Sequence, residues 1–255
     1  MLKENLVFLL DPKIASTESL DELSLLWRHI ADAVLGIYFE DEDLFRLAEL
    51  PFAQEISNLG QMKISTQTFN FSMQERRSQI EKLFSLSMKN SWRVKSQFIV
   101  ERGWLDSDLV KLINGAEFLV ICRHLNDAQL LYCIRHHTDG HILFINEPWR
   151  KGNCVVGIIE DYEAQTGMLK MVDYIGDRLN ISKVLGIANM QSKNIESGFT
   201  QYILPKEHGN SANLIDFVQS LDARVVVWSA KFANETQIRD IYQSTQSSCL
   251  LIKDG

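Results

Sequence analysis

Residues 6 to 11 read Leu6-Val7-Phe8-Leu9-Leu10-Asp11, and this stretch decides the fold class. A short continuous apolar run that ends at a turn signal, here Asp11 and Pro12, is typical of a strand buried on both faces. Such strands occur in parallel sheets whose two faces are covered by helices. The stretch therefore predicts an α/β protein whose first strand ends at Asp11.

The residues after this strand alternate between helical and strand patterns. Leu20, Leu23, Trp27 and Ile30 recur at three- and four-residue intervals, which predicts one apolar face of a helix. Short apolar runs predict further strands at residues 34–39, 92–100, 117–122 and 141–145. We therefore expect strands and helices to follow one another along the first part of the chain.

The segment between the second and third strands has a different composition. The acidic run from Glu40 to Asp43 predicts a solvated helix start, because carboxylates suit the free N–H groups of a first helical turn. Residues 58–70 are polar and aperiodic and predict a loop. Ser72 and Glu75 have capping-box spacing, so a long helix is expected to begin there.

The pattern restarts after Pro148, with the apolar run Val155 to Ile159. We expect two domains, at residues 1–148 and 153–255, each a mostly parallel five-stranded sheet with helices on both faces. An internal repeat supports this division, because Val34-Leu35-Gly36-Ile37 recurs as Val184-Leu185-Gly186-Ile187. The offset, 184 − 34 = 150, places Asp11 on Asp161.

Composition excludes several classes of protein. The 255 residues are 45% hydrophobic and 23% charged, which is enough apolar material for a sizeable core. The net charge of −7 repels phosphate backbones, so we expect no nucleic-acid partner. No apolar run approaches the roughly 18 residues of a membrane helix, and we expect no membrane partner. The four cysteines, which form no CxxC pair, predict buried thiols in a reducing cytoplasm (Cys122, Cys133, Cys154 and Cys249).

Candidate ligand-binding residues end or follow the predicted strands, because open α/β sheets bind ligands beyond the carboxyl ends of their strands. In the first half they are Asp11, Phe39, Gly103, Cys122, Arg123 and His124. Asp11 can accept from a sugar hydroxyl or an adenine amino group, or it can form a turn or cap the next helix. Arg123 and His124 suit a phosphate or a solvated strand end, since no glycine follows them before Gly140.

A second candidate site is a cluster of metal-type ligands. His136, His137, Asp139 and His141 lie within six residues and could hold a divalent ion. Adjacent helical residues point about 100° apart, however, so these side chains do not all converge from one helix. The alternative is a helix C-terminus, where histidines suit the helix dipole and Gly140 ends the helix. We expect no metal.

The sequence lacks the common catalytic and nucleotide-binding motifs. It contains no GxSxG, GxxxxGK[ST], HExxH or GxGxxG pattern. We therefore favour a binding protein over an enzyme and expect no resident cofactor.

Several segments resemble the universal stress protein family. Leu6 to Asp11 resembles the opening strand of the family and its aspartate. The second to fifth strands are matched by residues 35–41, 100–103, 118–122 and 142–145. Leu44 to Glu55 resembles a bacterial subgroup of these proteins. The resemblance covers most of residues 5–147 and is fainter across residues 153–253, where the order of elements supports it. It implies a tandem of two adenine nucleotide α-hydrolase-like domains, and in this family the fifth strands pair two domains.

The resemblance also implies a function. ATP-binding members hold adenine near the first-strand aspartate, here Asp11, and phosphates on a G-x2-G-x9-G-[ST] motif after the fourth strand. Cys122 stands where the first glycine is expected, and Trp228-Ser229-Ala230-Lys231 in the second half also lacks the motif. We therefore expect a non-enzymatic cytoplasmic stress-response or regulatory module that forms a homodimer or binds a protein partner, with at most weak ATP or AMP binding. The alternative is a nucleotide-hydrolysing enzyme of the same fold class.

Overall fold

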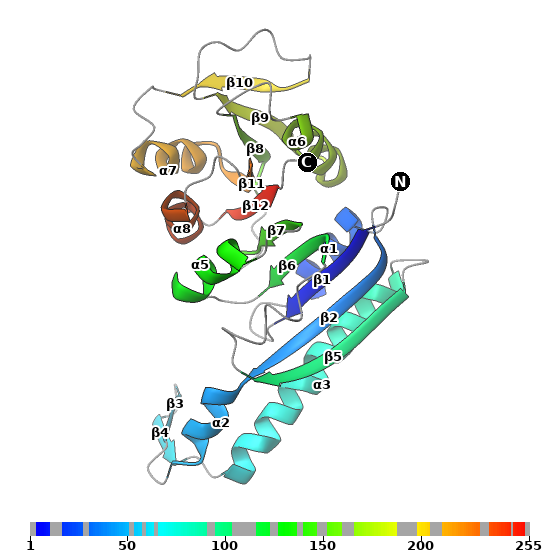
Figure 1. Ribbon diagram of the computed structural model, residues 1–255, viewed down its shortest axis with the longest axis vertical. Coiled ribbons are helices and arrows are strands. Elements are labelled where there is room, and N and C mark those ends of the chain that lie inside the picture. Colours follow the sequence, from blue (N-terminus) through cyan, green and yellow to red (C-terminus); the bar gives the residue numbers. More distant parts are fainter. Residues whose placement is uncertain are drawn as a thin grey trace.

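The computed structural model describes most of the chain. The described residues are 4–10, 17–27, 31–50, 54–57, 60–63, 66–90, 95–103, 116–122, 127–136, 140–146, 152–159, 166–187, 198–204, 211–229, 235–245 and 247–252. Strands and helices alternate through them, as the apolar runs predict, and the protein is an α/β protein (Figure 1). The predicted domain boundary, between residues 148 and 153, falls largely on residues 147–151, which lie outside the described part.

Ten strands form one mixed sheet in the order β10-β9-β8-β11-β12-β7-β6-β1-β2-β5. The strands of the first half (residues 4–146) are β1 (Glu4–Leu10), β2 (Ala31–Asp41), β5 (Lys95–Gly103), β6 (Phe118–Cys122) and β7 (His141–Phe144). Those of the second half (residues 152–252) are β8 (Cys154–Ile159), β9 (Ser182–Ile187), β10 (Thr200–Ile203), β11 (Ala223–Ser229) and β12 (Ser248–Ile252).

The two halves repeat one topology. Within each half the five strands of this sheet run parallel, and the third, second, first, fourth and fifth of them along the chain lie in that order across the sheet. The fifth strands meet in the middle, where β7 and β12 pair antiparallel, with Leu143 opposite Leu250. This antiparallel pair is the joint between the halves, and it makes the sheet continuous across them.

Helices cover both faces of the sheet, as strands buried on both faces require. One core cluster joins the sheet to α1 (Thr17–Trp27), α3 (Thr66–Asn90) and α6 (Thr166–Leu179). A second cluster joins the opposite face to α5 (Asp127–His136), α7 (Ser211–Ser220) and α8 (Glu235–Ser244). Successive residues of each strand therefore enter different cores, for example Phe8 the first and Leu9 the second.

The joint is reinforced on both faces of the sheet. Arg135 of α5 forms an ion pair with Glu235 of α8 at 2.7 Å, and Arg224 of β11 pairs with Glu22 of α1. The Asn146 side chain donates a hydrogen bond to the Tyr242 carbonyl at 2.6 Å. Side chains of one half thus hold the other half directly.

The first half carries an extension beyond the sheet, which we call the arm (residues 42–50, 54–57, 60–63 and 66–73). It contains α2 (Glu42–Ala48), β3 (Gln54–Ser57), β4 (Gly60–Lys63) and the first turns of α3. It lies past the carboxyl ends of β2 and β5, at the bottom of Figure 1.

The predicted loop at residues 58–70 is wrong at two places within the arm. Residues 60–63 form β4, which pairs antiparallel with β3. The long helix begins at Thr66 rather than Ser72. Backbone hydrogen bonds hold the hairpin, so it needs no apolar alternation, and the residues of the first helical turn, 66–68, are exposed. Neither the hairpin nor the exposed first turn of the helix therefore shows, in its sequence, the apolar periodicity from which strands and helices are predicted.

Candidate functional site

The first candidate site is the carboxyl edge of the first half. β1 lies between β2 and β6, with Leu10 paired to both Tyr38 and Cys122. Strand order reverses between β1 and β6, so this is a switch point, where open α/β sheets bind ligands. The structure brings the ends of the predicted strands together here.

The predicted site residues that are described do not form one cluster. Phe39 and Cys122 are 3% and 2% exposed, and they enter cores on opposite faces of the sheet. Gly103 pairs with Asp41 at the end of the outermost strand, β5. Three strand spacings separate β5 from β6, about 14 Å, so Gly103 and Cys122 do not lie side by side.

The remaining predicted residues stay predictions. Asp11, Arg123, His124 and Asp161 lie outside the described residues. So do His137 and Asp139 of the proposed metal cluster, and only the backbone of His136, at the end of α5, is described.

His141, the last member of the proposed metal cluster, has partners of its own. Its ring lies 5.3 Å from that of Phe118 on β6, centroid to centroid. Its backbone N–H donates to the Glu117 carbonyl at 2.9 Å. Among the described residues, no group of three metal-type side chains gathers anywhere. These contacts give His141 a packing role at the start of β7.

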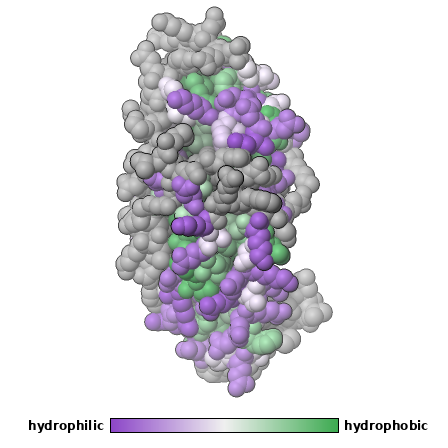
Figure 2. All heavy atoms as spheres, turned by 90° about the vertical axis from the view of Figure 1, so that its right-hand side faces the viewer, coloured by the Kyte–Doolittle hydropathy of each residue, from purple (hydrophilic) through white to green (hydrophobic). Residues whose placement is uncertain are grey.

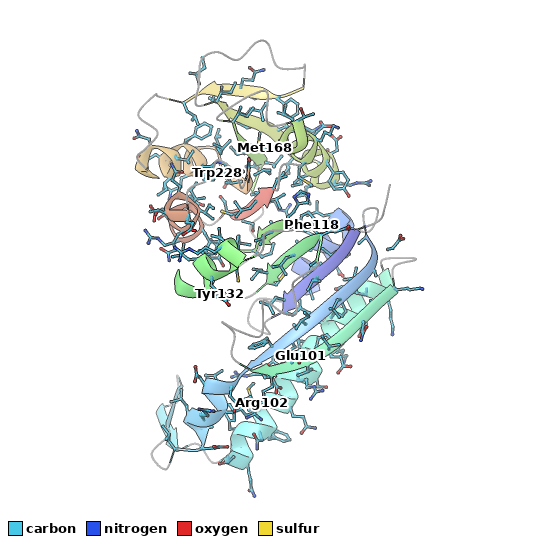
Figure 3. The ribbon with its side chains drawn as sticks, viewed as in Figure 1. Glu101, Arg102, Phe118, Tyr132, Met168 and Trp228 are labelled. Atoms are coloured by element: carbon cyan, nitrogen blue, oxygen red, sulfur yellow. The ribbon has the colours of Figure 1, made fainter. Side chains whose placement is uncertain are left out.

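A cluster that the sequence did not indicate connects the arm to the sheet. Arg102 of β5 donates a hydrogen bond to Glu42 of α2 at 2.8 Å, and its guanidinium carbon lies 3.6 Å from the centroid of the Phe45 ring. Phe45 in turn meets Phe69 of α3 edge to face, with 5.1 Å between centroids. Figure 3 shows Arg102 at the end of β5, beside the arm. The cluster fixes α2 and α3 against the carboxyl ends of β2 and β5.

Glu40 lies beside this cluster. Burial raises the pKa of the Glu40 carboxyl above its usual value, and the nearby Arg77 and Arg102 guanidinium groups partly oppose this rise. The acidic run was predicted to be a solvated helix start. The helix does begin there, at Glu42, which forms an ion pair with Arg102, but Glu40 lies within β2 and is half-buried, so the predicted solvated helix start is wrong for Glu40. The ion pair could not be predicted from the sequence, because Arg102 is 60 residues away from Glu42 along the chain.

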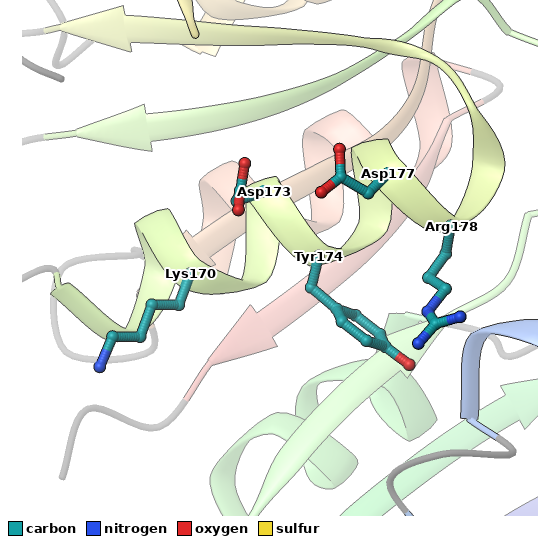
Figure 4. Close-up of a pocket in the computed structure, with 5 residues that line it drawn as sticks. All are labelled: Lys170, Asp173, Tyr174, Asp177 and Arg178. Carbon is teal, nitrogen blue, oxygen red and sulfur yellow. The ribbon is translucent and has the colours of Figure 1, made fainter. Parts of the chain in front are cut away.

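A pocket of 410 Å³ lies along α6 (Figure 4). It is lined by Lys170, Asp173, Tyr174, Asp177 and Arg178. Lys183 of β9 forms ion pairs with Asp173 at 2.5 Å and Asp177 at 2.6 Å, and these hydrogen bonds raise the pKa of Lys183. Tyr174 donates its hydroxyl to the Leu26 carbonyl of α1, and the Arg178 guanidinium carbon lies 5.3 Å from the Tyr174 ring centroid. Four of the five lining side chains are thus engaged in protein contacts.

Comparison with solved structures identifies the fold. A universal stress protein from Archaeoglobus fulgidus DSM 4304 matches with a TM-score of 0.62 and 7% sequence identity, over 100% of both chains. The fold is that of a universal stress protein. The match over the whole of both chains is consistent with a tandem arrangement.

Two further structures share this universal stress fold. The cytoplasmic domain of a prokaryotic cation chloride cotransporter matches with a TM-score of 0.56 and 12% identity, over 100% of this chain and 96% of that one. A functionally unknown protein from Pseudomonas aeruginosa PAO1 matches with a TM-score of 0.54 and 9% identity, over 99% and 93%. No protein-family model and no curated protein sequence matches the chain. Identities this low show the fold alone.

The fourth strand of the sheet in each half, β6 or β11, ends beside the first strand of that half, β1 or β8. Cys122 ends β6, and Ser229 ends β11 at the corresponding place, one residue beyond the paired Ile158 and Trp228. Both side chains are buried, at 2% and 0% exposure. A phosphate cradle needs backbone N–H groups that a ligand can approach closely, which glycine permits. Neither half provides a glycine at this place.

The structure also corrects the internal repeat. A Cβ atom on Gly36 would lie 2.8 Å from Phe84 of α3, whereas one on Gly186 would lie 2.8 Å from Phe217 of α7. These helices cover opposite faces, so the four-residue match does not mark equivalent positions. Leu10 and Ile159 end equivalent strands and enter the same core, which gives an offset of 159 − 10 = 149. The offset that pointed to Asp161 is therefore wrong by one residue.

Proposed function

We propose that this chain is a non-enzymatic regulatory module of the universal stress fold, which acts by binding protein partners and binds adenine nucleotides weakly at most. One observation carries the proposal: the fourth strand of each half ends in a buried residue other than glycine, Cys122 or Ser229. A side chain at this place limits how closely a phosphate can approach the backbone. The likeness to the cytoplasmic domain of a prokaryotic cation chloride cotransporter supports the proposal, since the similar structure there is one domain of a transport protein.

We further propose a cytoplasmic location, for which the cysteines are the support. All four are buried and form no disulfide. Burial raises the pKa of Cys249 to about 12 and that of Cys154 to about 11, so both thiols stay protonated at neutral pH. Four thiols that form no disulfide suit a reducing compartment. Separately, none of the helices in the described residues is long and apolar enough to cross a membrane.

A thermal-shift titration with ATP, ADP and AMP, with and without magnesium, tests the proposal. A ligand that binds only the folded state stabilises it by RT ln(1 + [L]/Kd), about 2.7 kcal/mol at a hundredfold excess over Kd. We expect no more than about 0.4 kcal/mol at millimolar nucleotide, the value for a ligand present at its own Kd.

Two variants complete this test. Asp11→Ala removes the carboxylate that the family resemblance assigns to adenine, and Asp216→Ala, at an exposed carboxylate of α7 in the second half, is its control. A large stabilisation that Asp11→Ala alone removes would overturn the proposal, and so would nucleotide hydrolysis that Asp11→Ala alone abolishes. The second result would favour the nucleotide-hydrolysing alternative.

A further inference from the structure

The second half ends in an exposed edge strand. Among the strands that the structure describes, β10 is the outermost of the sheet on that side, at the top of Figure 1. All four of its residues are exposed, including Tyr202 at 42% and Ile203 at 63%. Exposed apolar side chains on an edge strand are a typical template for pairing with another chain.

The backbone direction shows which groups point outward. The Leu204 N–H donates to the Ile187 carbonyl of β9 at 2.8 Å. Polar backbone groups of successive strand residues point to alternate sides, so those of Tyr202 also point toward β9. The N–H and C=O groups of Gln201 and Ile203 therefore point to the open edge. They form an antiparallel pairing surface two residue pairs long.

The composition of β10 provides no protection against such pairing. Its sequence, Thr200-Gln201-Tyr202-Ile203, contains neither a charge nor a proline. The edge strand of the other half, β5, carries Lys95, Glu101 and Arg102. Charged residues on an edge oppose pairing with another strand. By this criterion β5 is a protected edge and β10 is not.

We propose that β10 pairs antiparallel with β10 of a second copy of this chain, across a two-fold axis. The register that uses both outward residues places Gln201 opposite Ile203 of the partner subunit and the two Tyr202 side chains side by side. Each Gln201–Ile203 pair exchanges two backbone hydrogen bonds, and a cross-strand aromatic pair adds to them. This deepens the proposed function by naming one binding surface and its occupant.

Two features favour a second copy over another extended segment. When two identical charged edges meet across a two-fold axis, like charges come together and repel each other. Self-pairing of the uncharged strand β10 avoids this repulsion. The two halves of the chain are also already joined in this way, because β7 and β12 pair antiparallel at the opposite edge of the same half. The second copy would extend the sheet by the same contact.

Sedimentation of the full chain over a range of concentrations tests the proposal. We expect a reversible dimer. Gln201→Pro removes an outward N–H in each copy and leaves the ladder to β9 intact, so we expect dimerisation to weaken roughly tenfold or more. Gln201→Ala is the matched control, since it removes the side chain, keeps the N–H and should leave the dimer unchanged.

A charge variant gives a second, independent readout. Ile203→Lys places a cation from each copy at the contact and should also weaken the dimer. Gln97→Lys, on the other edge strand, should leave it intact. Far-UV circular dichroism and the thermal midpoint check that each variant is folded. A wild-type chain that stays monomeric overturns the proposal, even if it pairs with a foreign strand, and so does a dimer that survives both Gln201→Pro and Ile203→Lys. The nucleotide titration is read separately, so the two proposals can fail independently.

Discussion

The two halves of the sheet have the same strand order but differ in reach. The second and third strands of the first half, β2 and β5, have 11 and 9 residues, whereas their counterparts β9 and β10 have 6 and 4. The long pair supports the arm, and the short pair ends in the exposed edge of β10. The halves differ most where each strand lies far from the joint.

The strands near the joint, in contrast, are alike. β6, β8, β11 and β12 are buried along their whole lengths, and β7 along all but its first residue. β5 and β10 have exposed or half-exposed residues throughout. Strands packed on both faces tolerate little change, because substitutions that leave a cavity or overfill the core lower the free energy of unfolding by up to several kcal/mol. The comparison indicates that the joint sets the fold and the outer strands are where the halves acquired separate features.

The largest expected effect comes from breaking the joint. Phe144 is fully buried, and its ring meets Tyr242 of the other half with 6.0 Å between centroids. Phe144→Ala should lower the free energy of unfolding by about 3–5 kcal/mol. Because Phe144 packs on both halves, the chain should unfold in one urea transition, and the substitution should move its midpoint to a lower urea concentration. Leu44→Ala, at a side chain 44% exposed on α2, is the control and should change stability by less than about 0.5 kcal/mol. Two separate transitions, with one unmoved, would contradict this expectation.

The repeated glycines give an effect of intermediate size. Gly36→Ala and Gly186→Ala should each cost about 1–3 kcal/mol, because the new methyl group meets a ring at 2.8 Å. Phe84→Leu should relieve the first change only, and Phe217→Leu the second only. Double-mutant cycles from thermal or urea unfolding measure this coupling. Relief of both changes by the same partner would mean that the two glycines face the same side of the sheet.

The arm should respond locally to a change at its attachment. Arg102→Ala removes the hydrogen bond to Glu42 and the contact with the Phe45 ring, and since Arg102 is 45% exposed we expect a cost of about 1 kcal/mol or less. Hydrogen exchange should speed up in α2 and stay unchanged in the second half. Arg178→Ala, which removes the contact with the Tyr174 ring, is the matched control and should leave α2 unchanged. Faster exchange across both halves would show that the arm is not a local unit.

The smallest expected effect is the pH dependence at Glu40. Burial raises the pKa of this carboxyl in the folded state, so folding favours the protonated form. That contribution is complete below the unfolded value, about 4.3, and is lost as pH rises through the higher folded value. Glu40→Gln should therefore stabilise the protein slightly at pH 7, by a few tenths of a kcal/mol, and not at pH 4. A thermal midpoint difference that grows toward low pH would contradict this sign.

Much of the sheet could be predicted from the sequence because burial on both faces leaves a local signature. The runs around Phe8, Val120 and Val227 are apolar for this reason, and each is a strand. The hairpin of the arm left no such signature. The attachment of the arm depends on Arg102 of β5 reaching Glu42, which follows the end of the neighbouring strand β2, and this contact cannot be inferred unless the strand register is known.

The candidate site was less predictable than the fold. Sequence order placed Cys122 correctly at the end of a strand, but Gly103 is at the far edge of the sheet and Phe39 faces the other core. The distances between these residues depend on the order of the strands in the sheet and on the face to which each side chain points. A local sequence motif reveals neither. The repeat shows the same difficulty, since a shift of one residue turns every side chain to the opposite face.

Because β7 and β12 belong to the same chain, their antiparallel pairing has a consequence for how the two halves associate and how each can change in sequence. Two identical subunits joined by the same antiparallel strand pair would separate on dilution. Every mutation in their gene would also change both subunits. A peptide link between the halves replaces that association with an intramolecular one, whose effective concentration does not fall with dilution. It also lets a substitution in one half leave its counterpart unchanged. A single chain can thus keep its two half-sheets permanently joined while only one half lengthens its outer strands.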